Sequence, residues 1–545
     1  MQLIISGLDL LDSLSIRFYI TTHRATTLST FEISWSPNYI LIIFIVYEVL
    51  YFLIKKYYYE AITCLLPLTI YFISPQASIS VISLLFSIFI TKRENLFRDL
   101  IKWLFIVSDL FLILIFIHWT LFYPLNILTP ISQFADLENK LYYIFSLIIP
   151  VLSIIFFYSW ILIPHIRRRI SLTFNQSYYF IKSDYILVIS LLISILTALY
   201  PYINGVNPNN LIVGVDAIKY IQSLDIDYVK SNSNIVINNE RPFFFLILKI
   251  FKFLTNMSIE NSVKYFPTVL LPVLVFSTYF FSSKIANKDV ASWSSFFMAT
   301  GPTVVSSMYS YFLSNILGLI FILISLGLLF NSYESGRKIK LLASIILGSL
   351  CLFTHPWTFT HYVIGLLAFI GYIIYREHHL NIRRDNTNFF IYYITVQILV
   401  ELLDVFIIRG LSGSAALSDF AIITDSTQFW HSFTMSLTIY YGGALSNPIE
   451  LILGTIGLTI GLLDIGRKRI ASIYIIFLQI ATSFGFLMGN EITKSRLFIN
   501  TPLQCFASLG LISLASLYPD RRRYMETFVI LYSLVYLFRF LANLV

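Results

Sequence analysis

The sequence predicts an all-α polytopic integral membrane protein, and three observations support this fold class. Hydrophobic residues make up 57% of the 545 positions and charged residues only 12%. The apolar runs are about 18 to 24 residues long, as membrane-spanning helices require, whereas barrel strands would alternate over about ten residues. A helix also satisfies its own backbone hydrogen bonds in lipid. This composition excludes an ordinary soluble fold.

The apolar runs predict about sixteen membrane-spanning helices. The predicted spans are residues 38–54, 60–76, 78–91, 100–123, 141–164, 185–203, 265–283, 290–309, 313–331, 338–355, 358–375, 388–408, 448–464, 470–488, 501–518 and 524–543. The three cysteines all lie in apolar runs, so the sequence indicates neither a disulfide framework nor a cysteine metal cluster.

The distribution of basic residues predicts a topology in the cell membrane. The net charge is +8, and clusters of Lys and Arg lie at alternate ends of the predicted spans. Because such clusters favour the cytoplasmic side, both termini are expected to be extracytoplasmic, and no nucleic-acid partner is needed to explain the charge. The alternation holds only if residues 242–256 form a juxtamembrane or re-entrant helix on the outer side. A short ordinary span there is the alternative.

This topology predicts four segments. They are an extracytoplasmic tail at 1–37, a transmembrane region of about five helices at 38–166, a basic cytoplasmic linker at 167–184, and a transmembrane core at 185–545 with outward loops at 204–241 and 411–447.

The first outward loop of the core contains the best candidate for chemistry, Asp216. Transfer of a group from a lipid carrier needs a carboxylate to accept a proton, cations to hold the phosphate, and an apolar groove for the lipid tail. We therefore interpret Asp216 as a general base, with a solvated charge or a helix N-cap as the competing role. Arg241 and Arg496 are candidates for binding the donor phosphate, because a guanidinium matches its oxygens bidentately. The alternative role for each is an interface anchor at headgroup depth.

A second set of residues is assigned to a cavity that binds the acceptor. Glu401 and Asp404 share one face of an apolar helix, where they are expected to face water or pair with a cation. His355 and Trp357 flank Pro356, which predicts a turn between two helices with both side chains near the outer surface. A polar contact for His355 and an interfacial position for Trp357 are the alternatives. The full set is Glu240, Glu401, Asp404, His355 and Trp357.

A divalent cation, Mg²⁺ or Mn²⁺, is a weaker hypothesis. Asp225 and Asp227 are separated by one residue and offer hard oxygen ligands. Two acids do not define a metal site, so a structural turn or a solvated helix face remains the alternative, and no cofactor is predicted with certainty.

The order of features from residue 185 onward resembles the GT-C superfamily of membrane glycosyltransferases. That superfamily includes oligosaccharyltransferase catalytic subunits, protein O-mannosyltransferases and aminoarabinose transferases. The resemblance rests on Asp216 in the first large outward loop, on Arg241-Pro242-Phe243-Phe244, and on the turn at Met308-Tyr309-Ser310 before Asn315.

The resemblance implies an inverting transfer of a sugar from a polyprenyl- or dolichyl-phosphate or -diphosphate carrier to a protein, lipid or glycan acceptor. Asp216 would be the base or would orient the acceptor, and Arg496 would match a basic residue that holds the lipid phosphate. The sequence lacks Trp-Trp-Asp-Tyr-Gly and a large soluble C-terminal domain. Transfer to Asn sequons is therefore disfavoured.

Two other function classes remain open. A transporter or flippase for a lipid-linked sugar or another amphiphile would explain the many spans and the intramembrane acids Glu401 and Asp404. No inverted repeat is evident in the sequence to support it. A membrane scaffold without activity would leave the acid-bearing outward loop unexplained.

Overall fold

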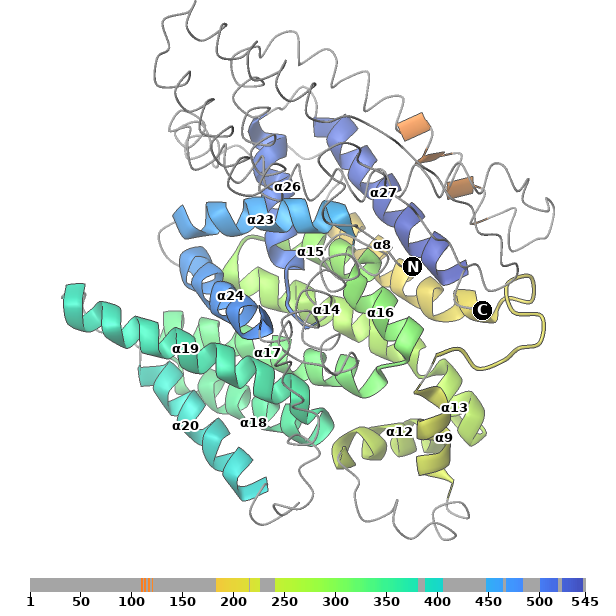
Figure 1. The fold of residues 1–545 in the computed structure, drawn as a ribbon, viewed down its shortest axis with the longest axis horizontal. Coiled ribbons are helices and arrows are strands. Elements are labelled where there is room, and N and C mark those ends of the chain that lie inside the picture. The colour runs from red at the N-terminus through yellow and green to blue at the C-terminus, as the bar shows by residue number, and fades with distance from the viewer. Residues whose placement is uncertain are drawn as a thin grey trace, which may run out of the picture. The chain divides into compact units, whose positions relative to one another are not determined.

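The computed structural model describes part of the chain, and its described residues are helical apart from short connections (Figure 1). The described residues are 109–110, 112–113, 116–117, 120, 183–214, 216–225, 241–380, 388–404, 447–463, 467–483, 500–517 and 522–542. The chain divides into two compact units. The larger comprises Phe116–Ile127, Ser177–Leu514 and Ile530–Val545 and contains every site discussed below.

From residue 183 onward the long helices follow the predicted apolar runs, whereas the short helix α9 lies in the predicted outward loop 204–241. The helices are α8 (Ser183–Leu199), the 3-10 helix η4 (Tyr200–Tyr202), α9 (Ala217–Leu224), α12 (Pro242–Thr255), α13 (Ile259–Tyr265), α14 (Pro267–Ile285), α15 (Lys288–Thr300), α16 (Pro302–Ser310), α17 (Leu313–Ser335), α18 (Lys338–Thr354), α19 (Pro356–Leu380), α20 (Asn388–Leu403), α23 (Pro448–Leu463), α24 (Arg467–Ser483), α26 (Gln504–Leu517) and α27 (Arg522–Ala542).

Within the described residues, five stretches are long and apolar enough to cross a membrane. They are Ser183–Tyr202, Ile259–Ile285, Leu313–Ser335, Pro356–Tyr375 and Arg522–Leu541. They indicate a multi-pass membrane protein. The predicted total of about sixteen spans, the four predicted segments and the orientation of the termini stay predictions.

The predicted span at 290–309 is interrupted in the structure. α15 ends at Thr300, Gly301 is extended with φ −88° and ψ 173°, and Pro302 begins α16. Proline suits the first turn of a helix because the missing N–H has no intrahelical partner there. The sequence pattern missed this break because both halves are apolar.

α17 is the central helix of the described core. It packs against α14 and α18, and 83% of the residues in its most apolar stretch are buried. Polar side chains inside this core form hydrogen bonds between helices. Ser325 of α17 bonds to the Ser344 carbonyl oxygen of α18 at 2.7 Å and to the Tyr393 hydroxyl of α20 at 2.9 Å. Such interhelical hydrogen bonds specify helix pairing in an apolar environment.

α23 and α26 pack at close range through glycine, which yields a prediction. A methyl group at Gly457 would lie 1.8 Å from the Phe506 carbonyl oxygen, whereas one at Gly454 on the same helix would meet its nearest neighbour at 3.6 Å. We expect Gly457→Ala to lower the free energy of unfolding by about 2–3 kcal/mol, because backbone must move apart. Gly454→Ala should change it by less than about 0.5 kcal/mol. Thermal unfolding in detergent compares the two variants, and equal midpoints would contradict this packing.

Candidate functional site

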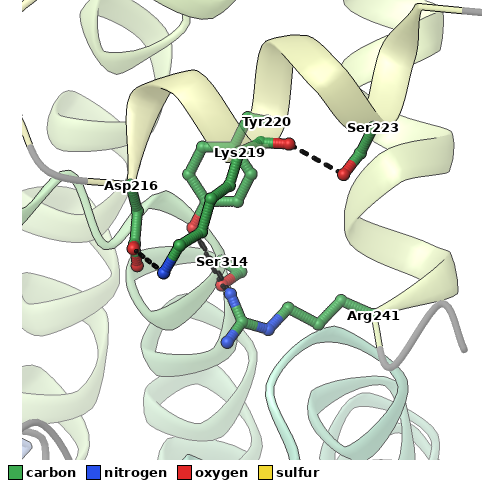
Figure 2. A network of polar contacts seen from close by, with 6 residues as sticks. All are labelled: Asp216, Lys219, Tyr220, Ser223, Arg241 and Ser314. Carbon is green, nitrogen blue, oxygen red and sulfur yellow. Dashed lines mark hydrogen bonds and ion pairs between the residues drawn. The ribbon is translucent and has the colours of Figure 1, made fainter. Parts of the chain in front are cut away.

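Asp216 occupies the N-cap position of the short helix α9, and its residue is only 6% exposed. Its backbone N–H donates to the Ser310 carbonyl oxygen at 3.1 Å, which ties the loop to the end of α16. Its carboxylate accepts from the Lys219 ammonium group at 2.9 Å (Figure 2). The carboxylate makes no capping bond to α9. The Lys219 side chain is 70% exposed, so its ammonium group can move into water.

Tyr220, Arg241 and Ser314 form a second group of contacts at the same helix, and we call these three residues, together with Asp216 and Lys219, the Asp216 cluster. Asp216 and Tyr220 are one helical turn apart and so share a face of α9. The Arg241 guanidinium donates through Nη1 to Ser314 Oγ at 2.8 Å and to the Tyr220 hydroxyl at 3.5 Å (Figure 2). Tyr220 and Ser314 also bond to each other at 3.3 Å.

Arg241 keeps donors available for a ligand. Its two contacts within the described residues both use Nη1, and its residue is partly exposed. A guanidinium carries five N–H donors in a planar fork that matches phosphate oxygens. Arg241 is also the residue before Pro242, at the N-cap of α12, so its backbone is fixed by the start of that helix. The arrangement therefore suits the binding of an oxyanion at Arg241, beside Tyr220 of α9.

The loop before Asp216 is fixed by a close contact with Tyr311. Gly214 has φ +100°, and a methyl group there would lie 2.5 Å from Tyr311 Cβ. Tyr311 adopts a left-handed conformation with φ 59° and donates its hydroxyl to the Val263 carbonyl oxygen at 2.7 Å. Burial raises the pKa of the Tyr311 phenol well above its ordinary value, so the group stays a neutral donor. The turn between α16 and α17 therefore clamps the Asp216 loop against α13.

A buried lysine holds the other side of the same loop. Lys264 of α13 is 2% exposed, and its ammonium group bonds to the side chain of Asn210 and lies 4.5 Å from the Tyr202 ring centroid. Asn207 bonds twice to Leu211, through its side-chain amide at 2.7 Å and its side-chain oxygen at 3.1 Å. These contacts fix residues 203–214 and so position Asp216 from its N-terminal side.

A second polar network begins at Asn315, the residue that follows Ser314. Asn315 donates to Asn500 at 2.9 Å and accepts from Thr358 at 2.6 Å, and Asn500 donates to Thr358 at 3.1 Å. These bonds close a three-membered ring in which each side chain both donates and accepts. His355 Nδ1 lies 2.7 Å from the Thr358 hydroxyl. The ring joins α17, α19 and residue 500 and anchors the end of α17 that carries Ser314.

The acceptor-cavity residues predicted from sequence are found in different places. His355 lies between α18 and α19 as expected, and it is 1% exposed and bonded to Thr358, which is the polar contact given above as its alternative role. Thr360 of α19 donates to Glu401 at 3.5 Å, and Asp404 is 3% exposed. Trp357 is partly buried. Glu240, Asp227, Arg496 and residues 411–446 lie outside the described residues.

Sequence reasoning missed Tyr220, Ser314 and Tyr311. Tyr220 had a detectable signal, because it follows Asp216 by four residues and shares its helix face. Ser314 and Tyr311 had none, since their contacts with residues about one hundred positions earlier depend on how α17 packs.

The described residues do not supply a metal site. No three His, Cys, Asp or Glu side chains gather in the described part of the chain. Asp225 is the C-cap of α9, and its predicted partner Asp227 lies outside the described ranges. The one acid at the centre of the site, Asp216, contacts an ammonium group.

Comparison with known proteins gives a distant structural likeness. Neither a protein-family profile nor a curated protein sequence matches the chain. The oligosaccharyltransferase of Archaeoglobus fulgidus, tethered to an acceptor peptide containing the NVT sequon, aligns with a TM-score of 0.47 at 13% identity, over 66% of this chain and 55% of that one. The same enzyme, AglB, in complex with an inhibitory peptide and dolichol-phosphate gives the same values. Its complex with zinc and sulfate aligns with a TM-score of 0.41 at 13% identity, over 66% and 52% of the two chains. The chain thus matches little more than half the length of that enzyme.

Proposed function

We propose that this protein is a membrane glycosyltransferase that moves a sugar from a polyprenyl- or dolichyl-phosphate carrier to a protein, lipid or glycan acceptor. One observation carries the proposal. A nearly buried carboxylate, Asp216, and a guanidinium with available donors, Arg241, border the same short helix. This pair supplies the base and the phosphate ligand that the reaction needs. The GT-C resemblance of the sequence around the same two residues supports the assignment.

In the proposed reaction, the acceptor atom attacks the anomeric carbon of the sugar from the face opposite the carrier. The new bond to the acceptor forms as the bond between carbon and phosphate oxygen breaks, so configuration inverts. The electron pair of the broken bond leaves with the carrier phosphate, whose negative charge Arg241 and Arg496 stabilise. The acceptor proton passes to Asp216, which either removes it or orients the acceptor. Lys219 must leave the carboxylate before this step, and its exposure allows it to do so.

Glycan analysis tests the proposed function directly. Mass spectrometry of surface-protein and lipid glycans is compared between cells lacking this protein and cells complemented with it. We expect one sugar to be missing without the protein and restored with it, while its lipid-linked precursor accumulates in the deficient cells. An unchanged glycan profile in both strains would contradict the proposal.

Arg241 provides a second prediction, on donor binding. Arg241→Lys keeps the charge but removes the planar fork that holds two phosphate oxygens. We expect KM for the lipid-linked donor to rise about tenfold, and Ser314→Ala, which removes a neutral contact, to raise it about threefold. KM for the acceptor should stay unchanged in both variants. Steady-state kinetics in nanodiscs measure this, and an unaltered donor KM in Arg241→Lys would remove Arg241 from the phosphate site.

Transport is the alternative, and one buried acid favours it. Glu450 of α23 is 3% exposed, and its Oε2 has no hydrogen-bond partner within the described residues. It packs against Gly301, where α15 gives way to α16. Ionisable groups inside membrane helices often belong to proton or substrate pathways. Proton uptake by proteoliposomes on adding the lipid-linked sugar, lost in Glu450→Gln, would favour transport over transfer.

A further inference from the structure

The break between α15 and α16 brings two oxygen atoms from different helices to the same place. Gly301 links the two helices, and a methyl group there would lie 2.3 Å from the Phe297 carbonyl oxygen and 2.5 Å from Glu450 Oε2. Both oxygens therefore border the side of Gly301 on which other residues carry a side chain. They are close enough together to bind one ion between them, although α15 and α23 are far apart in sequence.

The Phe297 carbonyl oxygen is available because α15 ends here. In a continuing helix it would accept from the N–H group four residues later, which belongs to Gly301. That N–H group instead donates to the Met298 carbonyl oxygen at 3.4 Å. The last carbonyl groups of a helix have no intrahelical donor and form the negative end of its dipole, so they favour a cation.

Glu450 Oε2 is also unsatisfied. The residue is 3% exposed, and this oxygen has no hydrogen-bond partner in the part of the chain that the structure describes. The N–H groups at the start of α16 therefore do not hold it, and a proton placed on it would have no acceptor. A buried carboxylate needs a counter-charge or hydrogen bonds to offset its desolvation.

The neighbouring side chain of Gln504, at the start of α26, offers a third oxygen. Gln504 is 1% exposed and interacts with the Glu450 carboxyl group. Its amide nitrogen donates to the Thr303 hydroxyl at 3.2 Å, while its amide oxygen has no partner among the described residues. Two buried side chains that touch each other thus both carry an unsatisfied oxygen, which indicates a shared ligand.

The charge of these groups indicates a monovalent ion. Carboxylate, amide and carbonyl oxygens are ligands of hard cations. One carboxylate balances one positive charge, whereas a divalent ion would leave an excess charge among apolar helices. The divalent ion predicted at Asp225 and Asp227 needs several acidic ligands, but sodium does not. In membrane proteins, sodium binds to backbone carbonyl groups where a helix is interrupted.

We propose that Glu450, the Phe297 carbonyl oxygen and the Gln504 amide oxygen form a sodium-binding site. The bound ion joins α15, α23 and α26 at the helix break and supplies the counter-charge of the buried carboxylate. This role depends on neither transfer nor transport of a lipid-linked sugar.

The sodium site is separate from the Asp216 cluster. Gly301 precedes the first residue of α16, whereas Ser310, which accepts from the Asp216 N–H group, is the last. The 9 residues of α16 extend about 13 Å between these two places. The ion therefore acts on the packing of the helices and does not contact the candidate base.

Thermal unfolding in sodium and choline salts tests the site. The purified protein is placed in nanodiscs, and its unfolding midpoint is measured during a sodium titration at constant ionic strength, with choline chloride as the replacement. We expect a saturable rise of several degrees, because a ligand that binds only the folded state stabilises it. Glu450→Gln should lose this rise, and Glu260→Gln, an exposed acid in the first turn of α13, should keep it. An equal rise in Glu450→Gln would overturn the proposal.

Direct binding of radiolabelled sodium tests the same site without unfolding the protein. We expect saturable binding to the parent protein that unlabelled sodium displaces and that equal concentrations of potassium or choline do not. Gln504→Leu, which keeps the carboxylate, should weaken binding several-fold and serves as the second variant if Glu450→Gln does not fold. Absence of binding to the parent protein would overturn the site, and equal displacement by potassium would overturn its assignment to sodium. Neither readout involves sugar transfer, so their failure would leave the proposed function untouched.

Discussion

Asp216→Asn is expected to reduce sugar transfer by about 10²- to 10⁴-fold, the contribution of a positioned general base. Asparagine has nearly the same shape, and the backbone bond to Ser310 does not involve the side chain. The fold of the loop should therefore survive. The amide cannot accept the acceptor's proton or bind it as a carboxylate would.

The stability of the same variant separates a catalytic role from a structural one. The ion pair lost with Lys219 is mostly solvated on the lysine side, and such pairs contribute about 0 to 1 kcal/mol. We therefore expect the unfolding midpoint of Asp216→Asn to stay close to that of the parent protein. Asp184→Asn is the control, since it removes an exposed carboxylate paired with Lys288 at 2.6 Å. Its activity should be normal. Full transfer activity in Asp216→Asn would exclude Asp216 as the base.

Residues that act through a local pattern could be selected from the sequence alone. Asp216 and Arg241 were selected in this way, because each lies where a polar loop meets the start of a helix. Pro242 marks that boundary after Arg241. The long apolar helices could also be predicted, since about twenty apolar residues in a row have few alternatives to a membrane helix. The short helix α9, inside the predicted outward loop, was not predicted.

Contacts between distant helices could not be predicted in this way. Ser314 lies in α17 and Tyr311 in the turn before it, and α17 packs against helices far from it in sequence. One amino-acid sequence does not show which face of a helix packs against which neighbour. His355 illustrates the same limit. The turn at Pro356 was predictable, but the burial of His355 depends on the hydrogen-bonded ring of Asn315, Thr358 and Asn500. Glu450 was not singled out, because an isolated acid at the start of an apolar run resembles an ordinary helix end.

Gly214→Ala is expected to have the largest effect on stability of the substitutions considered, lowering the free energy of unfolding by about 4 kcal/mol. Two costs add. A non-glycine residue at φ +100° is strained, and its Cβ would lie 2.5 Å from Tyr311 Cβ, which cannot move freely because Tyr311 is buried and bonded to Val263. Relief would shift the loop, so Asp216 would lose its position and transfer activity would fall with stability.

Gly336→Ala separates these two costs. Gly336 also has a positive φ, +67°, but nothing lies within 4 Å of the position a Cβ would take. It ends α17 as a left-handed C-cap, so alanine there should cost only about 1 kcal/mol of backbone strain. Thermal unfolding and transfer assays of both variants provide the comparison. A loss in Gly214→Ala no greater than in Gly336→Ala would show that Tyr311 does not clamp the loop. A larger loss, together with reduced transfer by the protein that remains folded, would establish that the turn between α16 and α17 positions the candidate base.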